Sequence, residues 1–151
     1  MATLSVTLTE DLTLNGYQQG GTNSFTIASI TQAFKRIITV EASNDATVLT
    51  FGATVHAAAG AQDVGSVKYI RITNLDSSNS VTLGMVGASD NFQLVLAAGQ
   101  SFVMGSPDDC MLGETDTSPA FASLEDLATV VVDTAANAVQ LEVFTAAITT
   151  A

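Results

Sequence analysis

The sequence predicts an all-β fold, an antiparallel β-sandwich or jelly-roll-like domain of about ten strands. Short segments of alternating apolar and polar residues recur between clusters of turn-forming residues, which is the pattern of half-buried strands. Thr and Val are abundant, and β-branched side chains suit a pleated surface. Apolar residues at helical spacing are nearly absent. The 151 residues are expected to form a single domain, 1–151.

The first alternating segment lies at the start of the chain. Apolar residues occupy every second position from Leu4 to Leu8, and the pattern resumes at Leu12 after the Glu10-Asp11 break. Residues 1–15 are therefore expected to form either the first strand of the sandwich or an arm. A terminal strand of this kind can pair within its own sheet or add to the edge of another subunit.

Three later segments share one form, in which an apolar strand, a turn rich in Asn, Asp or Ser, and a second apolar strand follow one another. Each is expected to be a hairpin of one sheet system, because Asn and Asp tolerate the left-handed backbone of turns. Their strands cover residues 37–40 and 48–51, 70–72 and 81–83, and 130–132 and 139–141. A further tight turn is expected at Ala97-Ala98-Gly99.

Inward-facing positions of these strands predict the core. Removal of their apolar area from water would drive the packing of two sheets. The expected core residues are Leu4, Val6, Ile27, Ile38, Val40, Ile70, Ile72, Val81, Leu83, Leu94, Phe102, Leu141 and Val143.

A long acidic loop is expected over residues 105–126. It contains acidic residues and no cation, and it is either an interaction arm or a solvated excursion of the surface. Ser123 with Asp126 resembles a capping box and predicts a short helical turn at 124–128. Asp108, Asp109, Glu114 and Asp116 could offer oxygen ligands to Ca²⁺, although the register of a calcium loop is missing. The acidic residues are Asp108, Asp109, Glu114, Asp116, Glu125 and Asp126.

Charge and composition exclude several classes of function. The chain has four Lys and Arg against fifteen Asp and Glu, a net charge of −11. Four cations cannot build the basic patch that binds phosphates, so neither nucleic acid nor a membrane surface is an expected partner. One Cys and one His exclude an internal disulfide and multi-Cys or multi-His metal sites. No signal peptide and no apolar run long enough to span a bilayer is expected.

No enzymatic constellation is found, and neither an activity nor a cofactor is expected. Cys110 and His56 could form a thiolate–base pair, but acidic neighbours disfavour a thiolate at Cys110. Glu41 and Glu142 could act as a carboxylate pair on a glycoside, yet no Trp is present to stack a sugar. The charged and aromatic residues that stand out are instead candidates for an interface between copies of the chain: Lys35, Arg36, Lys68, Tyr69, Arg71, Asp108 and Asp109.

The stretch 67–104 resembles small virion proteins of tailed bacteriophages. The resemblance lies in the progression Ile70-x-Ile72-x-Asn74-x-Asp76, Val81-x-Leu83 and Leu96-x-x-Gly99-x-Ser101. It implies a β-sandwich structural protein without catalytic residues.

We therefore expect a capsid decoration (cement) protein that stabilises the head shell of a tailed phage by bridging major capsid subunits. Its partners would be the major capsid protein and copies of itself, arranged as a trimer. It would be synthesised in the host cytoplasm and end in the virion. The alternative is a tail, collar or fibre-associated module that contacts a host receptor or carbohydrate, and a hydrolase is a remote third.

Overall fold

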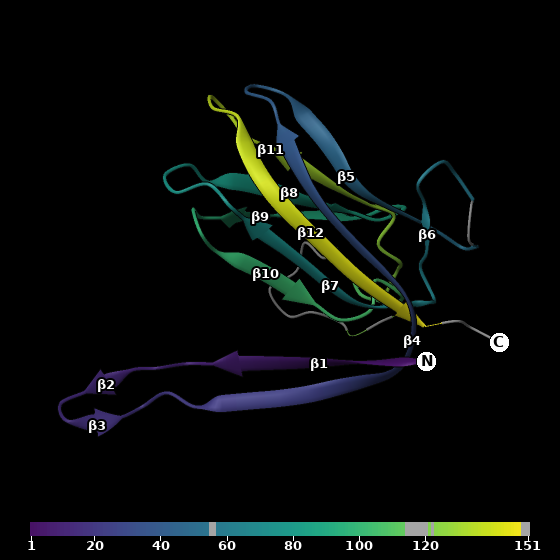
Figure 1. Cartoon of the computed structure of the whole chain (residues 1–151). Helices are drawn as coiled ribbons and strands as arrows, with labels where there is room; N and C mark the ends of the chain where they lie inside the picture. Colours follow the sequence, from purple (N-terminus) through teal and green to yellow (C-terminus); the bar gives the residue numbers. More distant parts are fainter. Residues whose placement is uncertain (55–56, 114–120, 122, 149–151) are drawn as a thin grey trace.

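The structure is a computed structural model that describes residues 1–54, 57–113, 121 and 123–148. It confirms the all-β fold, because the described residues form strands and no helix. None of them forms a helix of the length and apolarity needed to cross a membrane. Figure 1 shows a sandwich of two sheets with a long hairpin beside it.

The strands follow one another along the whole chain. They are β1 (Ala2–Thr9), β2 (Thr13–Leu14), β3 (Tyr17–Gln18), β4 (Thr22–Val40), β5 (Asp45–Gly52), β6 (Gln62–Asp63), β7 (Val67–Asn74), β8 (Val81–Val86), β9 (Asn91–Leu96), β10 (Ser101–Met104), β11 (Thr129–Asp133) and β12 (Val139–Ile148).

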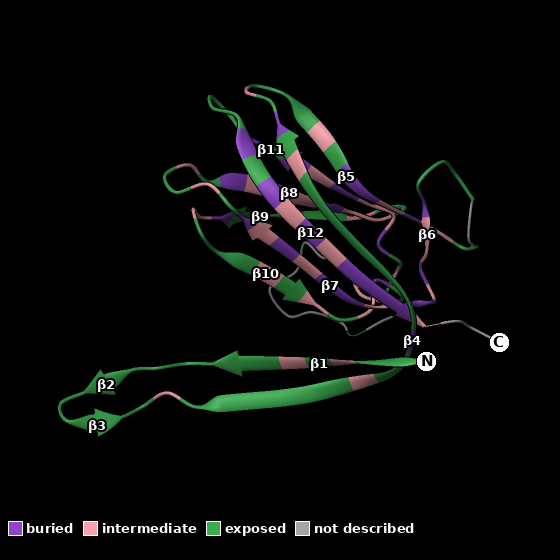
Figure 2. Ribbon diagram, viewed as in Figure 1, coloured by how far each residue is buried: buried purple, intermediate pink, exposed green. Residues whose placement is uncertain are grey.

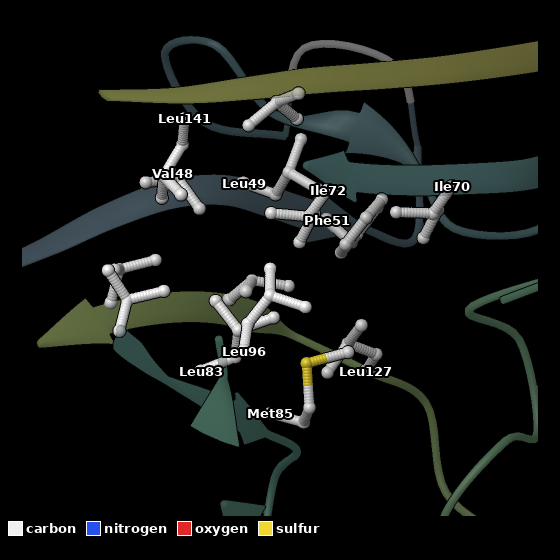
Figure 3. Close-up of a cluster of buried hydrophobic side chains, with 14 of the residues drawn as sticks. Val48, Leu49, Phe51, Ile70, Ile72, Leu83, Met85, Leu96, Leu127 and Leu141 are labelled. Carbon is white, nitrogen blue, oxygen red and sulfur yellow. The ribbon is translucent and has the colours of Figure 1, made fainter. Parts of the chain in front are cut away.

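Two five-stranded sheets form the sandwich. The first, sheet A, has the order β1-β4-β12-β7-β10, and the second, sheet B, has the order β6-β5-β11-β8-β9. Neighbouring strands are antiparallel except β5 and β6, which pair in parallel. Apolar side chains from both sheets fill the space between them, as Figure 3 shows. Seven of the predicted core residues are buried there: Val40, Ile70, Ile72, Val81, Leu83, Leu141 and Val143.

The three predicted hairpins are wrong. In each of them the first strand lies in one sheet and the second in the other: β4 and β5, β7 and β8, and β11 and β12. The turns are where predicted, but each carries the chain across the core rather than back along the same sheet. Both arrangements place an apolar face on the core, so the alternating pattern is the same in each.

Side-chain hydrogen bonds fix these crossings. At the crossing from β7 to β8, the Asp76 carboxylate accepts hydrogen bonds from the backbone N–H groups of Ser78 and Asn79. These two bonds, with the larger effect from Asn79, lower the pKa of Asp76 below its usual value. The predicted turn at Ala97-Ala98-Gly99 is confirmed, since Gln100 N–H donates to Ala97 O and Gly99 has φ 73°.

The loop at 105–126 holds no helical turn at 124–128, and that prediction is wrong. Glu125 instead forms an isolated β-bridge with Met111, and its carboxylate accepts hydrogen bonds from the N–H groups of Ser89 and Asp90. Leu127 is buried in the core, and its N–H donates to Pro107 O. Burial of Leu127 and these long-range bonds hold the segment extended, which overrides the local capping signal.

Strand β4 is 19 residues long and belongs to two structures. Its first part pairs with β1, and its second part pairs with β12. Both registers are interrupted close to Ile30, where Ser29 takes the left-handed backbone with φ 63°. A bulge of this kind bends a strand. The part of β4 before the bend therefore forms half of a hairpin, and the part after it belongs to the sandwich.

Candidate interaction site

The hairpin formed by residues 2–30, which we call the arm, runs along one side of the sandwich (Figure 1). Its two strands have chemically different faces. On one face Leu4 lies opposite Ile27, and Val6 lies opposite Phe25. On the other face hydroxyl groups meet, and Thr7 Oγ1 lies 3.0 Å from Ser24 Oγ. The alternation of apolar and polar residues in β1 thus produces an amphipathic ribbon.

The tip of the arm is a second small hairpin, formed by β2 and β3. Asn15 and Gly16 both have positive φ, at 52° and 83°, as the two central residues of a type I′ turn require. The Asn-Gly pair between Leu14 and Tyr17 is the sequence signal for this hairpin, and the sequence analysis missed it. Leu12, Leu14 and Tyr17 are exposed here, with Tyr17 72% exposed.

The root of the arm packs on the outer face of sheet A. Tyr69 is only 6% exposed, and its ring centroid lies 6.5 Å from that of Phe25 on the arm and 5.9 Å from that of Phe144 on β12. Aromatic rings at such distances attract one another. Tyr69 and Phe144 belong to a second, smaller apolar cluster of Ile30, Tyr69 and Ala146 with Leu4, Val6, Ile27, Phe144 and Ile148.

This arrangement corrects part of the predicted core. Leu4, Val6 and Ile27 are half-buried and contact the second cluster, outside the sandwich, because the arm folds back on the far side of sheet A. Ile38, Leu94 and Phe102 are partly buried and pack against the main core as predicted. Figure 2 shows the contrast between the exposed arm and the buried interior of the sandwich.

A groove of about 600 Å³ lies between the arm and sheet A. Its apolar walls include Phe25, Val103 and Phe144, and β1 lines it continuously from Leu4 to Leu8. Since β1 ends sheet A, its outer edge has no neighbouring strand among the described residues. The groove therefore combines apolar side chains with a strand edge that can still pair.

Two cations, Lys35 and Arg71, line the sheet side of the groove, and both pair with Glu142 of β12. Lys35 Nζ lies 2.9 Å from Glu142 Oε2, and Arg71 Nη2 donates to Glu142 Oε1. The hydrogen bond from Lys35, together with the charges of Lys35 and Arg71, lowers the pKa of Glu142 below its usual value, while burial opposes this. Arg71 also lies over the Phe144 ring, 5.8 Å from its centroid. The Glu142 carboxylate thus pairs with two cations, and the three side chains together keep one net positive charge.

The predicted interface residues fall into two places. Lys35, Tyr69 and Arg71 come together at the groove. Arg36 is exposed on β4 and does not line the groove, while Lys68 Nζ donates to Gly65 O. The sequence alone does not predict that Lys35 and Arg71 lie close together, because their proximity depends on the pairing of β4 and β7 with β12.

Asp108 and Asp109 lie elsewhere, in the acidic loop beside Asp126. The carboxylate oxygens of the three residues lie within 4.8 Å of one another, and all three side chains are exposed. Such a group could bind a hard cation such as Ca²⁺. Glu114 and Asp116, the other two predicted ligands, lie outside the described residues.

The candidate catalytic residues do not form a described site. Burial raises the pKa of the Cys110 thiol, so it is a poor nucleophile. His56, its proposed partner, lies outside the described residues. Glu142 is held by Lys35 and Arg71, whereas Glu41 is exposed beyond the end of β4.

Comparisons with known proteins do not assign the chain to a family. No protein-family model matches the chain, and no curated protein matches it. Among solved structures it is similar to one described as "Bacillus endospore appendages form a novel family of disulfide-linked pili", with 12% identity, a TM-score of 0.44, and coverage of 79% of this chain and 88% of that chain. A likeness of this size carries no argument about function.

Proposed function

We propose that this protein is a structural virion protein of a tailed bacteriophage, a capsid decoration (cement) protein that stabilises the head shell. In this role it binds across the joints between major capsid subunits. The observation that carries the proposal is the arm, a hairpin that leaves a complete sandwich and presents apolar side chains to solvent.

The exposed apolar side chains of the arm support an adhesive role. Leu8, Leu12, Leu14 and Tyr17 are all more than half exposed. The sandwich already has a closed core, so these residues are not needed to fill it. Apolar side chains gathered at one exposed place commonly mark a binding surface. The arm thus extends the reach of the body to a neighbouring subunit.

The energetics of a two-stranded arm favour the same role. An isolated hairpin is only marginally stable in water, and this one contacts its own body mainly near the root. A partner that binds the tip therefore stabilises both the arm and the assembled shell, by mass action. Strong net negative charge keeps the free protein soluble before assembly and away from a packaged genome.

The alternative of a carbohydrate-contacting tail or fibre module has less support. Sugar binding would need exposed aromatic rings, and the two Tyr residues are the only ones with a hydroxyl group. Tyr69 is buried beneath the arm, and Tyr17 stands alone at its tip. The exposed rings of Phe92 and Phe121 lack a hydroxyl group, so we propose the head rather than the tail as the location.

Copy number in purified particles tests the proposal. The protein would be quantified against the major capsid protein by mass spectrometry with isotope-labelled peptides from both chains. A head decoration protein is expected in hundreds of copies per particle. A count of about a dozen or fewer would place the protein in the tail or collar, and its absence from particles would overturn the proposal altogether.

A further inference from the structure

The groove and the tip of the arm have complementary chemistry. The arm carries two charged side chains, the carboxylates of Glu10 and Asp11 at its tip. The groove contains Lys35 and Arg71, two of only four cations in the chain. Lys35 is 61% exposed even while it contacts Glu142, so a second carboxylate can reach it.

Among the described residues, the two acids do not pair with the cations of their own chain's groove. Within the described part of the chain, Lys35 and Arg71 form ion pairs with Glu142 alone. Asp11 accepts a hydrogen bond from Gln18, and Glu10 N–H donates to Gly21 O. Neither acid lines the groove of its own chain.

The apolar residues match in the same way. Leu12 and Leu14 follow the two acids, are exposed and do not line the groove. The groove offers apolar walls and, along β1, a strand edge with no charge and no Pro between Ala2 and Thr9. An extended segment that enters it can therefore bury leucines and also pair its backbone with β1.

We infer that the groove binds the arm tip of a second copy of this chain, with Glu10 and Asp11 of that copy beside Lys35 and Arg71. Tip and groove are different surfaces, so the contact is head-to-tail and closes into a ring or continues as a chain. A ring of three is the trimer expected from the sequence. The inference names a partner for the arm of the proposed function and rests on that function for its role in the particle.

Charge reversal in the full-length protein tests the inference. Sedimentation velocity would give the dissociation constant of self-association for wild type, for Glu10→Lys with Asp11→Lys, and for Lys35→Glu. Each variant is expected to raise that constant at least tenfold, and the three substitutions together are expected to restore most of the affinity. High salt should weaken the wild-type contact, since exposed charges are screened.

Arg36→Glu is the matched control, because Arg36 neighbours Lys35 on β4 and lies outside the groove. It should leave self-association unchanged, and urea unfolding would verify that every variant is folded. A wild-type protein that is monomeric at about 100 µM would overturn the inference, as would equal effects of Lys35→Glu and Arg36→Glu. Neither result touches the proposed function, which depends on copy number in the particle.

Discussion

Two isoleucine substitutions distinguish the core of the sandwich from the cluster under the arm. Ile72 is fully buried between the sheets, and truncation of such a residue to alanine costs about 2–5 kcal/mol in free energy of unfolding. Ile27 is half-buried in the small cluster under the arm. Loss of three methylene equivalents at roughly 0.8 kcal/mol each, at half burial, gives about 1 kcal/mol for Ile27→Ala.

The two variants should differ in which part of the structure loses stability. With a urea m-value of about 2 kcal/mol/M, Ile72→Ala lowers the unfolding midpoint by roughly 1–2.5 M. Ile27→Ala should leave that midpoint within about 0.3 M of wild type, because the arm opens before the sandwich unfolds. Its effect should instead be a roughly fivefold loss of hydrogen-exchange protection in β1, as about 1 kcal/mol implies.

The measurement pairs urea unfolding with amide hydrogen exchange on both variants. Equal shifts of the midpoint would refute the reasoning, since they would make the arm part of the cooperative core of the sandwich. Unchanged exchange in β1 after Ile27→Ala would refute it as well, because the arm would then not depend on the second cluster.

Three further predictions follow from particular contacts. The pKa of Glu142 is lowered, so its contribution to stability is present above the unfolded-state pKa of about 4.3 and is lost as pH falls through the lower folded-state pKa. The difference in unfolding free energy between wild type and Glu142→Gln should therefore shrink below about pH 4, and a constant difference would contradict this. A Cβ at Gly20 would lie 2.0 Å from Glu10 O, whereas one at Gly21 would meet nothing within 4 Å. Gly20→Ala should thus remove hydrogen-exchange protection at Glu10 and Gln19 while Gly21→Ala preserves it, and similar protection in both variants would argue against this close approach. Burial raises the pKa of the Cys110 thiol, so its reaction with an aromatic disulfide at pH 7 should be slow in the native protein and fast in urea. An equally fast reaction in both states would show that the thiol is exposed.

The sequence supports the fold class and most of the core, because these depend on local pattern. Alternation at Ile70 and Ile72, and at Leu141 and Val143, identifies the faces that the structure buries. The same pattern cannot say whether two successive strands pair or face each other across the core. Each predicted hairpin is a crossing between sheets for this reason, since β5, β8 and β12 present apolar residues to one core in either arrangement.

The candidate site is harder to predict, because it depends on long-range geometry. Alternation in β1 predicts a strand, but the arm exists because β4 bends close to Ile30, and the left-handed Ser29 has no distinctive sequence signal. The meeting of Lys35 with Arg71 requires β12 between their strands. The tip was predictable, since Asn15-Gly16 is a strong local signal for a hairpin.

Deletion of the arm tests whether the arm is the adhesive element of the protein. The measurement is binding of the purified protein to phage heads that lack it, for wild type and for a variant without residues 2–28, which keeps the part of β4 that pairs with β12. A variant with Leu12→Ser, Leu14→Ser and Tyr17→Ser keeps the arm and covers the case in which the deletion fails to fold. Both variants are expected to keep a folded sandwich and to lose at least tenfold in affinity for the shell. Binding as tight as wild type by either folded variant would contradict the claim that the arm is the adhesive element.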